Sequence, residues 1–370
     1  MIVTQIETFR VSVPLIKPFK TALRTVTTAE SVVLKITCDN GITGWGEAPP
    51  TAVITGDTIA SIETAIHDYL KPYLLGKNIL NYEMVFQSLH KLLKRNSSSL
   101  AAMDMAIYDC LAQNSQLPLY QYLGGYRNQL ETDFTVSVNE PTEMADDASR
   151  YLSDGFHTLK IKVGIGEIET DIERVKEVRR RVGNSVTIRL DANQGWKPKE
   201  AVRAIRKMED MGLNIELVEQ PVIAHDLKGL KQVTDHVETL IMADESVFTL
   251  TDVLNVIQTR SADLMNLKLM KSGGIYQAEK MNSLAESAGI ECMVGSMIET
   301  HIGITAAVHF AASKKNITRF DFDAPLMLSE KIIDGGVMYK GNMITFSGGN
   351  GLGIKSIHVN KGECLHGEQR

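Results

Sequence analysis

Two lysines, Lys160 and Lys162, stand one residue apart in the otherwise apolar, strand-like run FHTLKIKVG. In a β-strand, residues i and i+2 point to the same face, so the two ammonium groups must lie side by side. Neighbouring like charges lower the pKa of a lysine, and a lysine that is neutral near pH 7 can act as a base. The same pattern also fits an edge strand that uses charge to prevent aggregation. The segment therefore predicts either a tuned base or a protected sheet edge.

The lysine pair belongs to a series of short apolar segments that recur about 24 to 29 residues apart, with amphipathic helix patterns between them. Their sequences are TDFTVSV, HTLKIKV, VTIRLDA, IELVEQP, LIMADES, DLMNLKL, IECMVGS and ITRFDFDA. Strands that alternate with helices at this interval indicate parallel βαβ units. Eight such units favour a closed (β/α)8 barrel of the TIM type over an open sheet.

The residues before and after this series have a different character. The first part of the chain alternates like strands and turns, helical patterns follow as far as Leu123, and the tail MITFSGGNGLGIKSI returns to strands and turns. We therefore expect an α/β protein with an α+β capping domain over residues 1–125, a modified (β/α)8 barrel over residues 126–345, and a C-terminal segment 346–370 that rejoins the capping domain. The stretch LIKPFKTALRTVTTAE has no clean period and is expected to form an ordered loop.

Acidic residues close three consecutive strands of the predicted barrel, where catalytic groups of such barrels lie. The third strand ends in Asp191, with Asn193 on the same face, the fourth ends in Glu219 and the fifth in Asp244. Three carboxylates at one place repel each other unless a cation neutralises them, and all-oxygen ligands select Mg²⁺, with Mn²⁺ as the substitute. For any single one of these acids, a helix N-cap or a surface charge is the alternative.

Lysines stand on both sides of these acids, with Lys162 on the strand before and Lys268 on the strand after. A carboxylate bound to the metal between them would present its α-carbon to a lysine on each side. A divalent cation stabilises the enolate that forms when the α-proton leaves, so one lysine can remove a proton and the other can return one to the opposite face. This arrangement predicts a racemase or epimerase. Schiff-base chemistry by Lys162 is a competitor, but it does not need the three acids.

The motifs Lys-x-Lys, Asp-x-Asn, Val-Glu-Gln-Pro, Ala-Asp-Glu-Ser and Asn-x-Lys-x-x-Lys-x-Gly-Gly together resemble the muconate-lactonizing branch of the enolase superfamily. Within that branch the chain is similar to the dipeptide epimerases, in particular those that act on L-Ala-D/L-Glu. The similarity extends nearly end to end, from KPFKTALRT at residues 17–25 to SGGNGLGI near residue 350.

The resemblance implies three Mg²⁺ ligands, which are Asp191, Glu219 and Asp244. It implies that Lys162 and Lys268 are the acid/base residues. It also implies that Lys160 helps to hold the substrate's carboxylate and lowers the pKa of Lys162. The expected reaction is epimerisation of the C-terminal residue of a dipeptide, which would belong to the recycling of cell-wall peptides.

The resemblance also implies which residues bind the substrate. Asp321 and Asp323, after the last strand, would bind the dipeptide's α-ammonium group, which substrates such as muconate and succinylbenzoate lack; an Asp-rich turn is the alternative. Arg24, in TALRTV, is the candidate partner for an acidic substrate side chain, with a surface arginine as the alternative. The same pocket is expected to include Thr135, Ser296, Met297 and Glu299. His301 has no assigned role and is expected to be solvated.

Two segments of the capping domain are expected to close over the barrel mouth and exclude water. These are residues 15–29 and residues 49–57. Three rival functions stay open: a cycloisomerase or o-succinylbenzoate synthase-type lyase of the same superfamily, an epimerase with a different dipeptide preference, and a scaffold without turnover.

Composition excludes several other classes of protein. The net charge of −6 over 370 residues gives no reason to expect nucleic acid or an anionic membrane as a partner. The N-terminus lacks a signal-peptide pattern, no run is long and apolar enough to span a membrane, and the four cysteines match no zinc or redox spacing. We therefore expect a cytoplasmic enzyme with a small-molecule dipeptide substrate, acting as a homo-oligomer.

Overall fold

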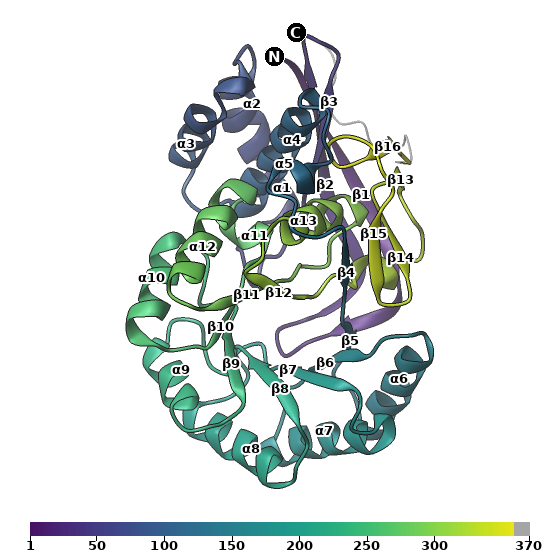
Figure 1. Ribbon diagram of the computed structural model, residues 1–370, viewed down its shortest axis with the longest axis vertical. Coiled ribbons are helices and arrows are strands. Elements are labelled where there is room, and N and C mark those ends of the chain that lie inside the picture. The colour runs from purple at the N-terminus through teal and green to yellow at the C-terminus, as the bar shows by residue number, and fades with distance from the viewer. Residues whose placement is uncertain (359–370) are drawn as a thin grey trace.

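The structure of the protein, a computed structural model, describes residues 1–358 (Figure 1). The N-terminal part forms an antiparallel sheet in the order β1-β2-β3, with helices against it. The strands are β1 (Val3–Lys20), β2 (Thr25–Cys38) and β3 (Thr43–Ala48), and the helices are α1 (Ile59–Thr64), the π-helix η1 (Ala65–Leu70), α2 (Lys71–Leu74), the 3₁₀-helix η2 (Ile79–Asn81), α3 (Tyr82–Leu92), α4 (Ser97–Asn114) and α5 (Leu119–Tyr122). Helix α4 packs so closely on β3 that a Cβ at Gly46 would overlap the carbonyl of Ala102.

The expectation of a loop over LIKPFKTALRTVTTAE is wrong, because most of this stretch continues β1 and β2. Phe19 pairs with Val26 and Lys20 with Thr25, so only a tight turn separates the two strands. Proline cannot donate a ladder hydrogen bond, and the pairing register shifts between Pro14 and Phe19. That irregularity removes the alternation by which a strand is normally detected in a sequence.

The barrel contains eight parallel strands in the order β12-β11-β10-β9-β8-β7-β6-β5. They are β5 (Phe134–Val136), β6 (Thr158–Lys162), β7 (Thr187–Asp191), β8 (Ile215–Glu219), β9 (Leu240–Ala243), β10 (Leu264–Asn266), β11 (Glu291–Val294) and β12 (Ile317–Phe320). The first and last strands meet where the N–H of Asp133 donates to the carbonyl oxygen of Phe320 at 3.3 Å. The predicted barrel with an α+β capping domain is therefore confirmed.

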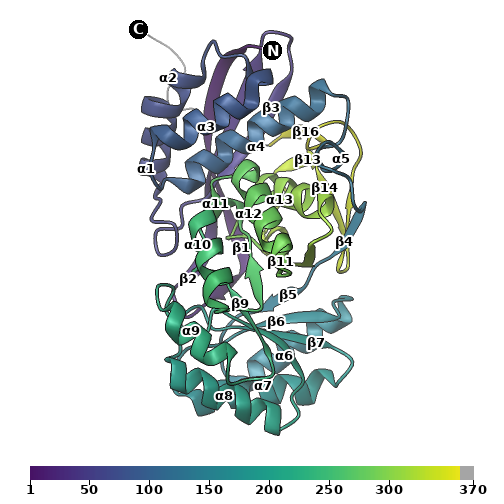
Figure 2. The same cartoon turned by 60° about the vertical axis from the view of Figure 1, so that its left-hand side comes forward.

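Helices follow the first seven strands and cover the outside of the barrel (Figures 1 and 2). They are α6 (Pro141–Ser153), α7 (Ile168–Val182), α8 (Pro198–Asp210), α9 (Leu227–Thr234), α10 (Leu250–Thr259), α11 (Leu269–Ser272), α12 (Ile275–Ser287) and α13 (His301–Ser313). After β12 the chain forms the 3₁₀-helix η3 (Ala324–Met327) and short strands instead of an eighth helix. Among residues 1–358, no helix is both long and apolar enough to cross a membrane.

The C-terminal strands lie beside the N-terminal domain (Figure 2). One sheet contains β13 (Ile333–Gly335) and β16 (Ile354–Ile357), and another contains β14 (Val337–Lys340), β15 (Met343–Phe346) and β4 (Gln129–Glu131). Leu352 then donates its N–H to Asp109 on α4 at 2.8 Å, so the chain returns to the N-terminal helices. Of the predicted rejoining segment 346–370, residues 359–370 lie outside the described residues.

Buried carboxylates of the N-terminal domain cap two barrel helices. Asp104 on α4 accepts hydrogen bonds from the N–H groups of Ile275 and Tyr276, at 2.6 and 3.2 Å, where α12 begins. Glu47 on β3 accepts from the N–H groups of Thr300 and Gly303, both at 2.7 Å, where α13 begins. The first backbone N–H groups of a helix have no partner within the helix, so each carboxylate satisfies two of them and ties the domains together.

Replacing Asp104 with Ala is expected to lower the free energy of unfolding by about 2 kcal/mol or more, because two buried N–H groups lose their acceptor. The matched control is Asp226→Ala, which removes the half-exposed cap of α9 on Gly229 (2.8 Å) and is expected to cost about 1 kcal/mol. Urea titration followed by circular dichroism measures both. Equal losses in the two variants would show that the interdomain cap has no special weight.

Candidate active site

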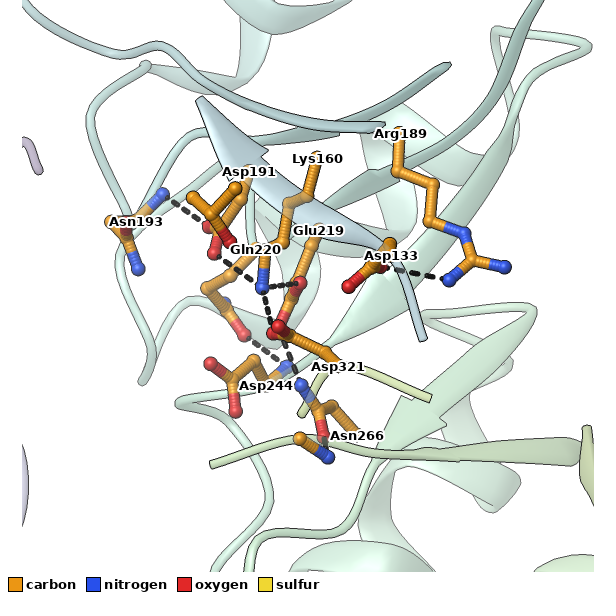
Figure 3. A network of polar contacts seen from close by, with 12 residues as sticks. Asp133, Lys160, Arg189, Asp191, Asn193, Glu219, Gln220, Asp244, Asn266 and Asp321 are labelled. Carbon is orange, nitrogen blue, oxygen red and sulfur yellow. Dashed lines mark hydrogen bonds and ion pairs between the residues drawn. The ribbon is translucent and has the colours of Figure 1, made fainter. Parts of the chain in front are cut away.

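The predicted acids and Lys160 meet at the carboxyl ends of neighbouring strands (Figure 3). Lys162 pairs with Asp191 across β6 and β7, and Asp191 pairs with Glu219 across β7 and β8. Asp244 follows the last residue of β9, two residues beyond the partner of Glu219, so it points to the same face. All of these side chains are buried, as is Lys268 after β10. The structure therefore brings together the residues that were predicted from the sequence to take part in the reaction.

Each of the three carboxylates has one oxygen fixed by the protein. Asp191 Oδ1 accepts from the backbone N–H two residues later at 2.9 Å, and Glu219 Oε1 accepts from Asn266 Nδ2 at 2.7 Å. Asp244 Oδ1 accepts from Lys271 Nζ at 2.6 Å. The second oxygen of each carboxylate is thereby turned toward the lysines described next. Such outer hydrogen bonds orient metal ligands in general.

Lys160 lies among the inward carboxylate oxygens. Its Nζ is 3.0 Å from Asp191 Oδ2, 2.7 Å from Glu219 Oε2 and 2.8 Å from Asp321 Oδ2. Burial alone would lower the pKa of Lys160, but these three carboxylates outweigh it and raise the pKa well above its ordinary value. The neighbouring charge of Lys162 therefore does not leave Lys160 with a lowered pKa, because opposite charges from neighbouring strands surround it.

The two flanking lysines contact different carboxylates. Lys162 Nζ donates to Asp191 Oδ2 at 2.6 Å and to Asn193 Oδ1 at 3.1 Å, and it lies 5.7 Å from the ring centre of Phe19. Lys268 Nζ donates to Asp244 Oδ2 at 2.8 Å. Burial opposes the charge on Lys268, yet the nearby carboxylates, Asp244 first, raise its pKa. The lysines thus stand on the two flanks of the acid row.

The donor set fits a hard divalent cation. Within residues 1–358, no three His, Cys, Asp or Glu side chains are already close enough together to hold a metal ion. However, the inward oxygens of Asp191, Glu219 and Asp244 all belong to carboxylates, and the buried Glu219 Oε2 forms an ion pair with Lys160 at 2.7 Å but has no well-directed hydrogen bond within the described residues. Burial, and next the charge of Asp191, raise the pKa of Glu219 to about 7 although the charge of Lys160 opposes them, so further positive charge would stabilise this carboxylate. Oxygen-only ligands of this kind suit Mg²⁺.

The lysines and the capping segments enclose one small pocket of about 50 Å³. The barrel contributes Thr135, Lys160, Lys162, Asn193, Lys268, Ser296, Met297, Ile298, Asp321 and Asp323. The N-terminal domain contributes Phe19, Thr21, Leu23, Arg24 and Ile54. All predicted substrate contacts except Glu299 thus line a single cavity. The apolar members Phe19, Leu23, Ile54 and Ile298 were not among the predicted pocket residues. The only signal for the first three was their place in the predicted closing segments, and for Ile298 its place between Met297 and Glu299.

Arg24 lies at the tip of the β1–β2 hairpin, in a turn closed by a hydrogen bond from the Thr21 N–H to the Arg24 carbonyl at 3.0 Å. Its guanidinium lines the pocket and has no hydrogen bond or ion pair with any of residues 1–358. Burial lowers the pKa of Arg24. A half-buried cation without a partner favours an anion in the pocket.

Asp321 and Asp323 form an acidic pair just after β12 that lines the same pocket. Asp323 Oδ2 accepts from the backbone N–H of Thr135 at 2.6 Å, while Asp321 contacts Lys160. Burial and the charge of Asp321 raise the pKa of Asp323 to about 7. Two carboxylates with one nearby ammonium group favour a second cation, as the expected α-ammonium contact requires.

The expectation that His301 is a solvated loop residue is wrong. His301 is buried at the first position of α13, its Nδ1 has no hydrogen-bond partner among residues 1–358, and burial lowers its pKa to about 4. Glu299, just before this helix, accepts from the N–H of Met297 at 2.9 Å and thus shapes the loop that lines the pocket.

Comparisons with known proteins agree with this arrangement. Residues 4–124 match the family model of the mandelate racemase / muconate lactonizing enzyme N-terminal domain, and residues 143–357 match the enolase C-terminal domain-like model. The chain therefore belongs to the mandelate racemase/muconate lactonizing enzyme family of the enolase superfamily, and it is an enzyme. The family resemblance inferred from the motifs is confirmed.

Individual relatives cover the whole fold. The chain is 64% identical to the L-Ala-D/L-Glu epimerase of Bacillus subtilis over 98% of this chain and 99% of that protein. A substrate-liganded complex of the B. subtilis L-Ala-D/L-Glu epimerase superposes with a TM-score of 0.96, covering 97% of this chain and 100% of that one at 64% identity. A dipeptide epimerase from Enterococcus faecalis V583 complexed with Mg and L-Leu-L-Tyr has a TM-score of 0.93 at 45% identity, covering 96% and 100%.

Glu299 is expected to make stability depend on pH. Burial, and next the charge of Glu47, raise its pKa from 4.5 to about 8. Between these values the folded protein keeps a proton that the unfolded chain has lost, so this group's contribution to stability falls as the pH rises, by at most about 1.4 kcal/mol per pH unit. Glu299→Gln removes this dependence and keeps the acceptor for Met297. Its melting temperature relative to wild type should increase steadily from pH 5 to pH 8.

The exposed glutamate Glu286 on α12 supplies the matched control. Glu286→Gln should keep a constant difference from wild type over the same range in differential scanning fluorimetry. A constant difference for Glu299→Gln as well would contradict the buried-proton explanation.

Proposed function

We propose that the protein catalyses Mg²⁺-dependent epimerisation of the C-terminal residue of a dipeptide, with L-Ala-D/L-Glu as the favoured substrate. The observation that carries the proposal is the placement of Lys162 and Lys268 on the two flanks of three inward carboxylate oxygens, in the pocket that also contains Arg24. Asp191, Glu219 and Asp244 would hold the cation, and Mn²⁺ is the expected substitute.

Bound there, Mg²⁺ supplies positive charge that stabilises the negative charge of the carbon acid after proton loss. One lysine, as a neutral amine, takes the α-proton, and the other, as an ammonium group, gives a proton to the opposite face. Lys160 pairs with the substrate's carboxylate and compensates its charge. With two bases, the same site works in both directions without turning the substrate.

The remaining residues fix the substrate's orientation. Asp321 and Asp323 bind the α-ammonium group, and Thr135 holds Asp323 in place through its backbone N–H. Arg24 pairs with the glutamate side chain, and Ser296 and Met297 contact the peptide from the loop after β11. The hairpin that carries Arg24 also covers the lysines and excludes water from them.

The relatives support this proposal at the level of substrate class and metal. The E. faecalis structure is named as a complex with Mg and a dipeptide, and the B. subtilis relative is named for L-Ala-D/L-Glu. The unpaired guanidinium of Arg24 favours the acidic substrate over a hydrophobic dipeptide such as L-Leu-L-Tyr. The acidic pair Asp321 and Asp323 disfavours cycloisomerase or lyase chemistry on substrates without an ammonium group. The homo-oligomeric state stays a prediction.

Proton NMR in D₂O tests the reaction directly. With enzyme, Mg²⁺ and L-Ala-L-Glu, the glutamate α-proton signal should disappear while signals of the L,D diastereomer grow. EDTA should stop both changes, and added Mg²⁺ should restore them. Exchange without the new diastereomer would show one working base and contradict the two-lysine mechanism. No exchange across a panel of acidic, hydrophobic and cationic dipeptides would overturn the dipeptide proposal.

Arg24→Met should lower kcat/KM for L-Ala-L-Glu about 30-fold or more, because a charge-assisted hydrogen bond is worth about 2 kcal/mol or more. Turnover of L-Ala-L-Met, whose side chain is uncharged, should change less than about threefold. The control variant is Arg10→Met on β1 of the same hairpin, since Arg10 bonds Glu63 at 2.7 Å and does not line the pocket. Equal losses for both substrates would mean that Arg24 supports the hairpin and does not read the glutamate.

A further inference from the structure

Asn193 connects one of the flanking lysines to a buried acid that the reaction does not use. Its Oδ1 accepts from Lys162 Nζ at 3.1 Å, and its Nδ2 donates to Glu245 Oε1 at 3.2 Å. The backbone of Asn193 is left-handed, with a φ of 40°, and its N–H donates to Asp191 Oδ1 at 2.9 Å. Asparagine tolerates this conformation better than most residues, so its side chain starts from a fixed place.

Glu245 decides which way round the Asn193 amide lies. The two ends of an amide are nearly equal in shape, but only its oxygen can accept a hydrogen bond from an ammonium group. Glu245 Oε1 accepts from the Nδ2 end, which leaves the oxygen end for Lys162. Without this acceptor the amide could turn and present two N–H donors to Lys162, which has no hydrogen-bond acceptor while it is charged.

The position of Glu245 gives it no other evident task. It follows Asp244, it is buried, and its Oε2 has no hydrogen-bond partner within the described residues. Burying a carboxylate whose second oxygen has no hydrogen-bond partner lowers the stability of the folded state. We therefore expect a function that explains why Glu245 is buried here. The contact with Asn193 is its one hydrogen bond from a side chain in the described part of the chain.

We infer that Glu245 is a positioning residue that acts through Asn193 to aim Lys162. This inference rests on the proposed function, in which Lys162 is one of two bases. When Lys162 is a neutral amine, one N–H stays donated to Asn193 Oδ1, and its lone pair is thereby turned away from Asn193 toward the pocket. Lys268 makes no hydrogen bond to Asn193 or Glu245 within the described residues, because its Nζ donates to Asp244, and Glu245 acts on it only through longer-range charge. Loss of Glu245 should therefore affect one face of the substrate only.

The test measures initial rates of α-deuterium incorporation in D₂O for L-Ala-L-Glu and L-Ala-D-Glu separately. Glu245→Met should lower the rate for one epimer about tenfold or more, since small misplacements of a reacting group are costly, and keep the other within about threefold. Glu245→Gln retains an acceptor oxygen and should recover most of that loss. Mg²⁺ affinity, measured by calorimetry on the metal-free variants, should stay within about threefold of wild type.

Asn193→Gly provides a second variant that keeps the left-handed backbone and leaves Glu245 in place. It should show the same one-sided loss, and the double variant with Glu245→Met should lose no more than Asn193→Gly alone. Equal losses for both epimers, or a loss that follows weakened Mg²⁺ binding, would overturn the inference. If wild-type enzyme incorporates deuterium into neither epimer, the proposed function fails first, and the two failures are thereby distinguished.

Discussion

The compensation of buried charge at the carboxyl ends of the strands governs the rest of this structure. Ionised side chains taken out of water are costly unless each one meets an opposite charge or several hydrogen bonds. Here Lys160 is placed among Asp191, Glu219 and Asp321, and Lys268 is paired with Asp244. Parallel strands bring these opposite charges together, because all their carboxyl ends lie on one side of the barrel. The site is therefore a consequence of strand register as much as of residue type.

The backbone is strained directly after two of the strands that carry these charges. Asn193 and Gln194 after β7, and Gln220 after β8, have positive φ values of 40°, 69° and 36° although none is glycine. Gln220 uses the conformation to accept from the N–H groups of Asp244 and Ser246, at 2.8 and 3.1 Å. Strain of this kind persists only where the surroundings determine it, and here it aims an acid on the next strand.

The barrel and its row of acids could be predicted from the sequence because both follow from local patterns of strand spacing and side-chain alternation. Strand spacing predicts parallel units, and alternation predicts that Lys160 and Lys162 share a face. Prediction from the sequence failed for the β1–β2 hairpin, where prolines break the alternation, and for His301, which a helix start buries. It did not find Glu47, which caps a helix 253 residues further along the chain, because only the folded structure brings the two together. Contacts made by Glu245 and Lys271 were missed for the same reason.

The two domains share one site because the barrel supplies the proton-transfer groups and the N-terminal domain supplies a contact to the substrate's side chain. The barrel fixes the lysines and acids on rigid strands, and this part suits any carbon acid with a carboxylate. The N-terminal domain adds Arg24 on a hairpin tip, and its buried acids Asp104 and Glu47 fix the starts of α12 and α13, the helices that follow Lys268 and the pocket loop. Substrate choice can therefore change at the hairpin while the proton-transfer groups stay in register, since no hydrogen bond within the described residues connects the Arg24 side chain to them.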